Sequence, residues 1–497
     1  MTSTENKNWS DAFKVYTNRR VVTMLFLGFS AGVPLLLIFS TLSLWLREAG
    51  VDRSAVTYFS WAALAYSFKF IWAPIVDKLP LPFLYRALGR RRSWLLLAQL
   101  SIISAILLMA FTDPAKGLGM MAIAAILLGF SSASQDIVID AFRIESAEAE
   151  FQAAMSAMYI AGYRIGMMVA GAGGLYLADF FGTQGEYTYS AWQSAYIIMA
   201  AVMLVGVATT LMVKEPENKQ TDNYLHDLSD YLRFLLMFIS MVATFVVGFN
   251  VFNFEIEFRF FNELLRLTLS LFSALAVMYL LSAVKIINRE MVSNTYVDPV
   301  VDFFKRYGKV ALLILLLVGL YRISDIVLGV ISGVFYKDIG FTKSEIASTA
   351  VLFGLFMTLL GGFMGGVFTM RFGVMRILLL GAILSAATNL LFMLLANNGH
   401  SIALLSTVIA ADNLSAGIAS AAFIAYLSSL TNISFTAVQY AILSSLMTLL
   451  PKVLGGYSGT MVNEFGYSTF FLITTALGLP VIFLILYLMR KDPGHIK

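Results

Sequence analysis

Long apolar runs constrain the fold of this chain more than any other feature of its sequence. Fourteen runs are about 20 residues long or longer, which is the length that a helix needs to cross a hydrocarbon layer of roughly 30 Å. They are too long for the alternating strands of about ten residues that build a membrane barrel. Charged residues make up 13% of the chain, against about 25% in soluble domains. The sequence therefore predicts an all-α, polytopic membrane helical bundle.

The placement of basic residues predicts the orientation of this bundle. With the N-terminus in the cytoplasm, 23 of the 34 lysines and arginines fall on the cytoplasmic side, 7 on the outer side and 4 within spans. Cytoplasmic loops carry such an excess of basic residues, so both termini are expected in the cytoplasm. The expected spans are 21–46, 54–77, 93–111, 118–142, 151–180, 191–213, 231–252, 267–288, 309–336, 344–370, 374–396, 401–427, 435–460 and 467–490.

The chain also contains an internal repeat. Segment 44–54, which joins the first two spans, recurs in kind at 334–344, so that Gly50 matches Gly340. Two related six-span halves are the layout of a transporter whose substrate site lies between the halves. Two further spans between the halves have no counterpart and look like an insertion. The predicted organisation is a cytoplasmic N-terminal tail (1–20), a six-helix bundle (21–213), a linker with two extra transmembrane helices (214–308), a second six-helix bundle (309–490) and a cytoplasmic C-terminal tail (491–497).

Eight ionisable residues fall within the expected spans, four of each sign. Each costs roughly 2.5–3.5 kcal/mol at that depth, so it is expected to face the bundle interior, to pair, or to line a wet cavity. One reading is that these residues are salt bridges that hold the halves in register. The other is that some bind substrate or relay protons as the bundle changes conformation. The eight are Lys69, Asp136, Asp140, Arg164, Arg322, Asp325, Asp412 and Lys452.

Segment 129–143 concentrates this polarity. Asp136, Asp140 and Arg143 are spaced i, i+4 and i+7, so they form a stripe along one face of a helix, and Gln135 lies beside them. The two aspartates are the leading candidates for proton coupling or substrate contact. Asp140 lies close to the cytoplasmic end of its span, so a role in a gate fits it equally well.

The other buried charges suggest two further arrangements. Arg164 and Lys452 occupy equivalent places in the repeat, and two cations facing each other across a central cavity could hold an anionic ligand. Arg322 and Asp325 are three residues apart on one expected helix, so they could simply pair with each other.

A candidate gating motif follows the second span. Asp77 ends that span, and Gly89, Arg90, Arg91 and Arg92 stand in the loop beyond it. An acid at a helix end with a basic cluster beyond it is similar to the cytoplasmic loop motif of the major facilitator superfamily, in which such charges latch one conformation. The motif therefore indicates the superfamily but carries no information about the substrate.

Signatures of cofactor chemistry are absent from the sequence. There is no phosphate-binding glycine loop followed by Lys and Ser or Thr, so the sequence predicts no ATP-hydrolysing domain. Three histidines without any cysteine give no convincing metal cluster. No cofactor is therefore expected.

Several local sequences resemble those of the AmpG-type muropeptide permeases. Segment 132–141, Ser-Ala-Ser-Gln-Asp-Ile-Val-Ile-Asp-Ala, is the most specific, and related acetyl-coenzyme A transporters keep parts of the pattern. The resemblance implies proton-driven import of N-acetylglucosaminyl-1,6-anhydro-N-acetylmuramic acid and its peptides across the inner membrane of a Gram-negative bacterium, for peptidoglycan recycling. It also implies an influence on β-lactamase induction. The matching segments are 68–77, 89–94, 132–141, 162–167, 320–325, 412–414 and 437–445.

We therefore predict a secondary transporter, not an enzyme, that works by alternating access. It is expected to act as a monomer in membrane lipid on a small-molecule substrate and protons, with no nucleic-acid partner. The alternatives are a transporter of another anionic solute, such as a coenzyme A thioester, and a membrane enzyme acting on lipid-linked sugars, which the short, mostly basic loops disfavour. The residues predicted to bind substrate or couple protons are Lys69, Gln135, Asp136, Asp140, Tyr163, Arg164, Arg322, Asp325, Asp412, Asn413 and Lys452.

Overall fold

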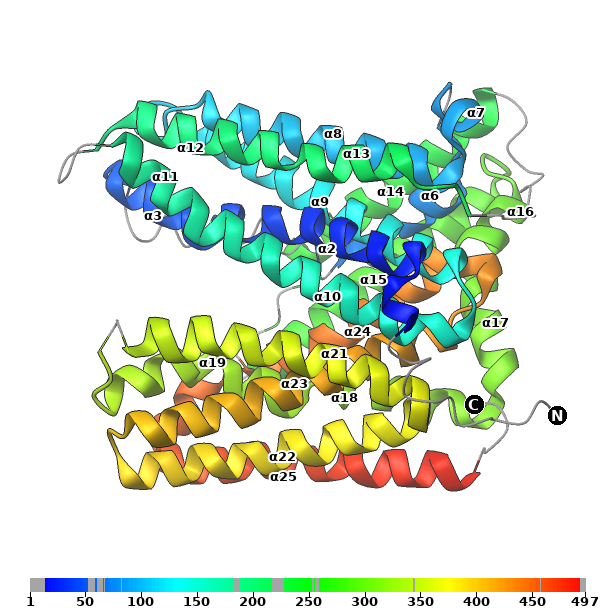
Figure 1. Cartoon of the computed structure of the whole chain (residues 1–497). Helices are drawn as coiled ribbons and strands as arrows, with labels where there is room; N and C mark the ends of the chain where they lie inside the picture. The colour runs from blue at the N-terminus through cyan, green and yellow to red at the C-terminus, as the bar shows by residue number, and fades with distance from the viewer. Residues whose placement is uncertain are drawn as a thin grey trace.

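The chain folds into long, roughly parallel helices (Figure 1). Within the described residues it has no strand, and eleven helices are long and apolar enough to cross a membrane. The expected all-α membrane bundle is thus confirmed. The computed structural model describes residues 14–51, 59, 66, 68–81, 83–182, 187–216, 228–252, 254, 259–342, 345–455 and 457–491.

The first bundle, α2 to α13, lies in the upper half of Figure 1. Its expected spans coincide with one helix or with consecutive helices, except for 54–77, most of which lies outside the described residues. Its elements are α2 (Arg19–Ile38), α3 (Ser40–Glu48), η3 (Lys69–Ile71), α6 (Ala73–Lys78), α7 (Leu84–Leu88), α8 (Arg90–Ala110), α9 (Leu118–Ser146), α10 (Gln152–Met168), η5 (Val169–Gly173), α11 (Gly174–Phe181), α12 (Tyr189–Val202) and α13 (Leu204–Met212).

The second bundle, α18 to α25, lies in the lower half of the same view. Gly466, with a φ of 75°, breaks the last helix at the point where the expected spans 435–460 and 467–490 are separated. The elements are α16 (Arg289–Val292), η6 (Ser293–Val297) and α17 (Asp298–Tyr307), which lead into the bundle, then α18 (Ala311–Leu320), α19 (Ile323–Asp338), η8 (Ile346–Phe353), α21 (Gly354–Phe372), α22 (Val374–Asn398), α23 (Ile402–Leu430), α24 (Thr436–Gly455) and α25 (Ser458–Lys491).

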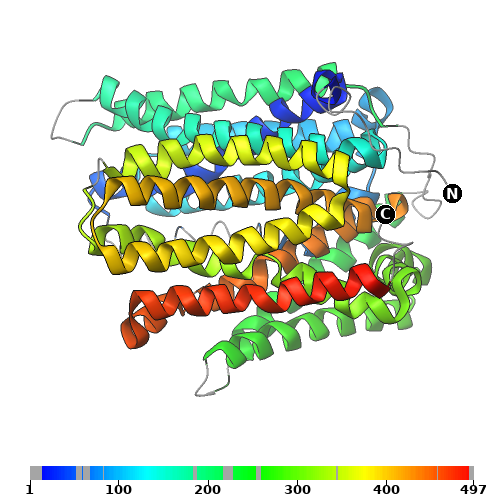
Figure 2. The same ribbon diagram turned by 60° about the horizontal axis from the view of Figure 1, so that its bottom comes forward.

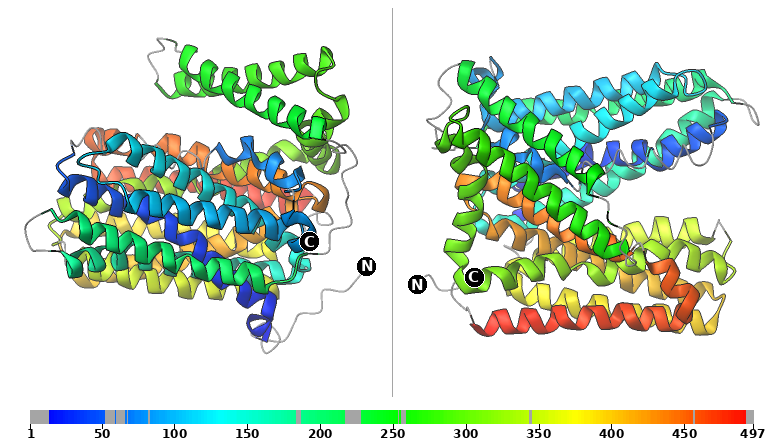
Figure 3. Two further views of the ribbon diagram at one scale, coloured as in Figure 1. Left: turned by 90° about the horizontal axis from the view of Figure 1, so that it is seen from above. Right: turned by 180° about the vertical axis from the view of Figure 1, so that it is seen from behind.

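The two helices between the bundles form a hairpin on the outside of the molecule. α14 (Leu228–Val251) and α15 (Arg259–Ala283) pack on each other and project away from the remaining helices (left panel of Figure 3). One end of the hairpin is anchored by an apolar cluster that includes Phe234, Met237 and Met291 and packs against Ile71 and Trp94. The pair therefore rests on the first bundle beside η3 and α6.

Interlocking glycines hold α2 and α10 together within the first bundle. A Cβ atom on Gly162 would lie 1.9 Å from the carbonyl oxygen of Leu25, and one on Gly28 would lie 2.2 Å from that of Tyr159. Protein interiors tolerate such close backbone approach only at glycine. This contact positions α10, and with it Arg164, relative to the rest of the bundle.

The two bundles meet at one end of the molecule. We call this the terminal end, because α2 begins there and α25 finishes there (Figures 1 and 2). Ile144, at the end of α9, is buried in the core of the second bundle. Ala437 and Ala441 of α24 are buried in return in the core of the first bundle. Apolar residues from each bundle thus seal the terminal end, while the two bundles diverge toward the opposite end (Figure 1).

Two spans are interrupted where they carry a charge. Lys69 lies in the short 3-10 helix η3, just before α6. Arg322 lies between α18 and α19, at the N-terminal cap of α19. Broken helices of this kind expose backbone groups only where protein or a wet cavity can satisfy them, and they mark binding sites in transporters. The interruptions therefore point to the two charges as parts of a site.

Candidate functional site

A buried ionic cluster lies in the first bundle between α9 and the broken second span. The Lys69 Nζ atom is 3.6 Å from Oδ2 of Asp140. Asp136, one turn earlier on α9, accepts a hydrogen bond of 3.5 Å from the Tyr159 hydroxyl and lies within electrostatic range of Lys69. All three charged side chains are less than 10% exposed. The structure thus brings Lys69 to the two aspartates of the stripe on α9.

Arg143 continues this cluster toward the second bundle. Its Nη2 is 3.4 Å from Oδ1 of Asp140, while its Nη1 donates a 2.7 Å hydrogen bond to the Ser428 hydroxyl of α23. Its guanidinium also lies 5.2 Å from the ring centre of Tyr440 on α24. Since the side chain is completely buried, these contacts are made in a low-dielectric interior, where they are strong. Arg143 therefore links the ionic cluster to the surface that closes the terminal end.

The polar residues beside the stripe have different environments. Gln135 is completely buried, and its amide has no hydrogen-bond partner among the described residues. The ring of Tyr163, on α10, lies 6.0 Å from that of Tyr159. The Tyr66 hydroxyl donates a 2.6 Å hydrogen bond to Ser132 of α9. The hydroxyl groups of Tyr66, Tyr159 and Tyr163 thus lie near Asp136.

A second cluster lies in the second bundle. Nε of Arg322 is 3.2 Å from Oδ2 of Asp325, and Nη1 of the same arginine donates to Ser420 at 2.8 Å. Asp325 also accepts a hydrogen bond from Ser385. Asp412 accepts from Thr388 at 3.3 Å and lies within electrostatic range of both Asp325 and Arg322. The pairing of Arg322 with Asp325 agrees with the sequence, and Asp412 joins the pair from α23.

Asn413, next to Asp412, faces α21. Its side-chain oxygen accepts a 2.8 Å hydrogen bond from Thr358, and its amide nitrogen donates to the carbonyl of Ile409 at 3.1 Å. These contacts use both ends of the amide. The structure thus gives Asn413 a role in helix packing, and its assignment to the substrate site stays a prediction.

Arg164 and Lys452 differ from the other charges because their side chains are exposed. Arg164 lies close enough to Arg322 of the second bundle for the two guanidinium groups to repel each other. The cation brought to Arg164 from the other bundle is thus Arg322, and the pairing of Arg164 with Lys452 stays a prediction. Two guanidinium groups near each other have the chemistry to bind an anion.

The candidate gating motif is assembled at the terminal end. Nη2 of Arg91 lies 2.6 Å from Oδ1 of Asp77 and 2.6 Å from Oε1 of Glu145. Arg90 donates to the carbonyl of Asp77 at 3.1 Å and lies 3.6 Å from Glu145. Arg92 donates to the backbone carbonyls at the end of α13. The motif therefore ties the ends of α6, α8, α9 and α13 to one another.

Glu215, just beyond α13, completes this arrangement. Its carboxylate accepts hydrogen bonds from the backbone N–H groups of Arg91 at 2.7 Å and Arg92 at 3.0 Å, in the first turn of α8. Gly89, with a φ of 87°, leaves room for it, because a Cβ there would lie 2.4 Å from Cγ of Glu215. Burial raises the pKa of the Glu215 carboxyl, although the two N–H groups lower it. Glu215 thus fixes the start of α8 from outside the helix.

Further polar contacts join the two bundles at the same end. Lys78 donates to the carbonyl of Ser434 at 3.5 Å and lies over the ring of Phe435. The Tyr16 hydroxyl donates to the carbonyl of Phe363 at 3.1 Å. Together with the contacts of Arg143, these bonds show the protein closed at its terminal end.

Comparison with known proteins identifies the family. The sequence profile described as Major Facilitator Superfamily matches residues 24–336. The chain is 32% identical over 478 residues to "Putative transporter AmpG 4" of Rickettsia felis, covering 96% of this chain and 98% of that protein. It is 30% identical over 478 residues to the anhydromuropeptide permease of Escherichia coli K12, covering 96% and 81%. The chain is an AmpG-type member of the major facilitator superfamily. This AmpG-type protein is therefore a multi-pass membrane transporter.

Solved structures agree with this family at the level of the fold. The proton:xylose symporter XylE matches 98% of this chain with a TM-score of 0.58 at 13% identity. The E. coli fucose:proton symporter FucP matches 94% with a TM-score of 0.60 at 10% identity. The AmpG-type transporter thus shares the helical architecture of these symporters.

Two residues of the terminal-end network of this AmpG-type transporter, Glu145 and Glu215, belong to no motif that the sequence shows. Glu145 is an acid just beyond the expected end of its span, and Glu215 lies in a polar stretch that reads as linker. The charge balance of the motif is a signal for such residues. The loop has three adjacent arginines but the motif has one acid, Asp77, which indicates that further acidic partners come from elsewhere in the chain. The sequence places Arg143 in the stripe on α9, but nothing local in the sequence indicates its contact with Ser428.

Proposed function

We propose that this protein imports anhydro-muropeptides, meaning N-acetylglucosaminyl-1,6-anhydro-N-acetylmuramic acid and its peptides, from the periplasm to the cytoplasm for peptidoglycan recycling. The observation that carries the proposal is the 30% identity over nearly the whole chain to a protein named anhydromuropeptide permease. Such a substrate is anionic, because the lactyl group of the peptide-free sugar, or the peptide attached to it, carries a carboxylate. An exposed guanidinium beside a second one, as at Arg164 and Arg322, suits carboxylate recognition.

Transport is proposed to be driven by protons. In support of this, Asp136 and Asp140 are one turn apart and buried, and Lys69 lies near both of them, whereas the second nearby cation, Arg143, contacts only Asp140. Asp136 therefore has no cation in direct contact among the described residues, and a buried carboxylate in that position is costly to keep charged, so a proton is a natural partner for it. We propose that one of the pair binds the coupling proton, while Asp412, with its own neighbour Asp325, is the equivalent candidate in the second bundle.

Alternating access is proposed to proceed by rocking of residues 21–213 against residues 309–490, with 214–308 as the linker. The terminal end is assigned to the cytoplasm of the inner membrane, in keeping with the excess of basic residues there. The conformation would then be closed toward the cytoplasm, and the contacts of Arg143 and Lys78 would have to break for substrate release. The protein is proposed to act as a monomer.

The proposal is tested by uptake of labelled N-acetylglucosaminyl-anhydro-N-acetylmuramic acid into right-side-out membrane vesicles, with and without an uncoupler. We expect accumulation that the uncoupler abolishes. Absence of uptake would refute the substrate, and uptake indifferent to the uncoupler would refute proton coupling.

Carboxylate variants test the site itself. Asp136→Asn and Asp140→Asn are compared with Asp179→Asn, an exposed carboxylate near the end of α11. We expect accumulation to fall at least tenfold in one of the first two and to stay unchanged in the control. If both site variants accumulate substrate like the wild type, neither carboxylate carries the coupling proton.

A further inference from the structure

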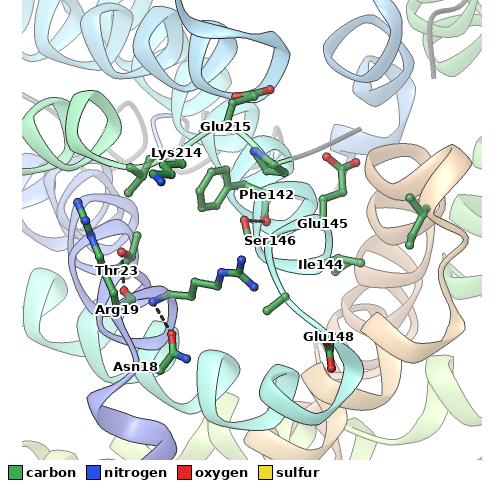
Figure 4. Close-up of a pocket in the computed structure, with 15 residues that line it drawn as sticks. Asn18, Arg19, Thr23, Phe142, Ile144, Glu145, Ser146, Glu148, Lys214 and Glu215 are labelled. Carbon is green, nitrogen blue, oxygen red and sulfur yellow. Dashed lines mark hydrogen bonds between the residues drawn. The ribbon is translucent and has the colours of Figure 1, made fainter. Parts of the chain in front are cut away.

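A pocket of about 690 Å³ opens at the terminal end (Figure 4). The charged residues of the two ionic clusters are not among the residues that line it. One wall is the start of α2, from Asn18 to Thr23, and another is the end of α9, from Phe142 to Glu148. The segment 213–216 after α13 forms a third wall, and Ile433 of the second bundle contributes as well. The lining is therefore complete only while the two bundles meet at this end.

Two of the three glutamates of the pocket already have partners. Glu145 is held by Arg90 and Arg91, and Glu215 by the backbone N–H groups at the start of α8. The third glutamate, Glu148, is exposed and has no such partner among the described residues.

The basic residues of the pocket are not neutralised in this way. Arg19, Arg20 and Lys214 line it, and Figure 4 shows Arg19 and Lys214 on the side opposite Glu145 and Glu148. Arg19 donates to the backbone carbonyl of Met212 at 3.2 Å. Within the described part of the chain, neither Arg20 nor Lys214 has an ion-pair partner. Arg20 and Lys214 are therefore two cations of the pocket that no carboxylate in the described structure pairs with.

On the side of the pocket opposite Glu148, the charged and amide groups available to a ligand are donors. The Asn18 side-chain oxygen already accepts the N–H of Arg20 at 2.9 Å, so its amide nitrogen remains to donate. An ammonium, a guanidinium and an amide N–H match the oxygens of a phosphate, which accept hydrogen bonds. Phe142, Val213 and Ile433 add apolar surface beside these donors. The combination suits a phosphate that carries an organic group.

We propose that this pocket is a binding site for an organic phosphate, with Arg20, Lys214 and Asn18 as its donors. The phosphate could belong to a soluble metabolite or to the headgroup of an anionic lipid, since the start of α2 lies where a membrane surface would meet the bundle. Both sources present the same group to the same donors. The site is distinct from the transport site and does not depend on the transported substrate.

The test uses the full-length protein in nanodiscs of phosphatidylcholine and measures its thermal unfolding temperature. One arm adds adenosine monophosphate as a soluble organic phosphate, and the other replaces part of the lipid with phosphatidylglycerol. The variants are Arg20→Gln combined with Lys214→Gln, Lys214→Gln alone in case the pair folds poorly, and Lys305→Gln as a control. Lys305 is an exposed basic residue on α17 outside the pocket.

We expect a saturable rise of the unfolding temperature in at least one arm. The apparent affinity should be at least tenfold weaker in the double variant, about threefold weaker in Lys214→Gln, and unchanged in the control. A response to adenosine monophosphate supports a soluble ligand, and a response to phosphatidylglycerol alone supports a lipid headgroup. The proposal is overturned if neither arm raises the unfolding temperature, or if the pocket variants respond like the wild type.

Discussion

Removing the Ser428 hydroxyl should loosen the closed terminal end by a calculable amount. This hydroxyl accepts a 2.7 Å hydrogen bond from Arg143, across the boundary between the bundles. A hydrogen bond to a charged group contributes about 1.5–3 kcal/mol. Because Nη1 of Arg143 keeps Gln152 and Ser156 as acceptors, we expect the lower figure for Ser428→Ala. About 1.5 kcal/mol corresponds to a roughly tenfold shift from the closed toward the open end.

The absence of cysteine in the chain makes this shift measurable. Ala437 of α24 is 1% exposed and belongs to the core of the first bundle, so it is covered while the terminal end is closed. A single cysteine at that position, introduced as Ala437→Cys, should react with a water-soluble maleimide only when this end opens. Its labelling rate then follows the population of the open form, and Ser428→Ala should raise the rate about tenfold.

Ser429→Ala is the matched control. The Ser429 hydroxyl donates only to the carbonyl of Tyr426 within its own helix, so its loss should leave the rate within about twofold of the wild type. If Ser428→Ala also leaves the rate unchanged in a protein that unfolds at the normal temperature, Arg143 does not hold the two bundles together. Equal acceleration by both serine variants would point instead to a general loosening of α23.

Three further outcomes are expected. Gly162→Ala should lower the free energy of unfolding by about 1–3 kcal/mol by forcing α2 away from α10, whereas Gly119→Ala, with nothing within 4 Å of the added carbon, should leave the unfolding temperature unchanged. Arg91→Met should lower the free energy of unfolding by about 3–5 kcal/mol because it leaves the buried Asp77 without its ion-pair partner and leaves Glu145 with Arg90 alone, and Arg86→Met on exposed α7 should not. Arg322→Lys should raise the KM of uptake about tenfold with little effect on kcat, since lysine keeps the charge but loses the planar fork; an unchanged KM would remove this residue from the substrate site.

The sequence predicted the helices well because hydropathy and length decide whether a segment spans a membrane. The sequence did not predict the breaks in the helices at Lys69 and Arg322. A charged residue within an apolar run looks the same in the sequence whether the helix is continuous or interrupted there. The sequence did predict that Asp136 and Asp140 lie close together, because their i, i+4 spacing places both side chains on the same face of one helix. Contacts between distant segments, such as that of Arg91 with Glu145, depend on how the helices pack, which no local pattern encodes.

Asp140 connects the proposed transport site to the closed end through its two oxygens. Oδ2 faces Lys69 and Oδ1 faces Arg143, which in turn reaches Ser428 and Tyr440 of the second bundle. A neutral Asp140 would weaken its hold on both cations at once, so a change of charge in the site is transmitted to the gate without any intervening element. Asp140→Asn should therefore accelerate labelling of the cysteine at position 437, as Ser428→Ala does. A labelling rate equal to that of the wild type would separate the ionic cluster from the gate.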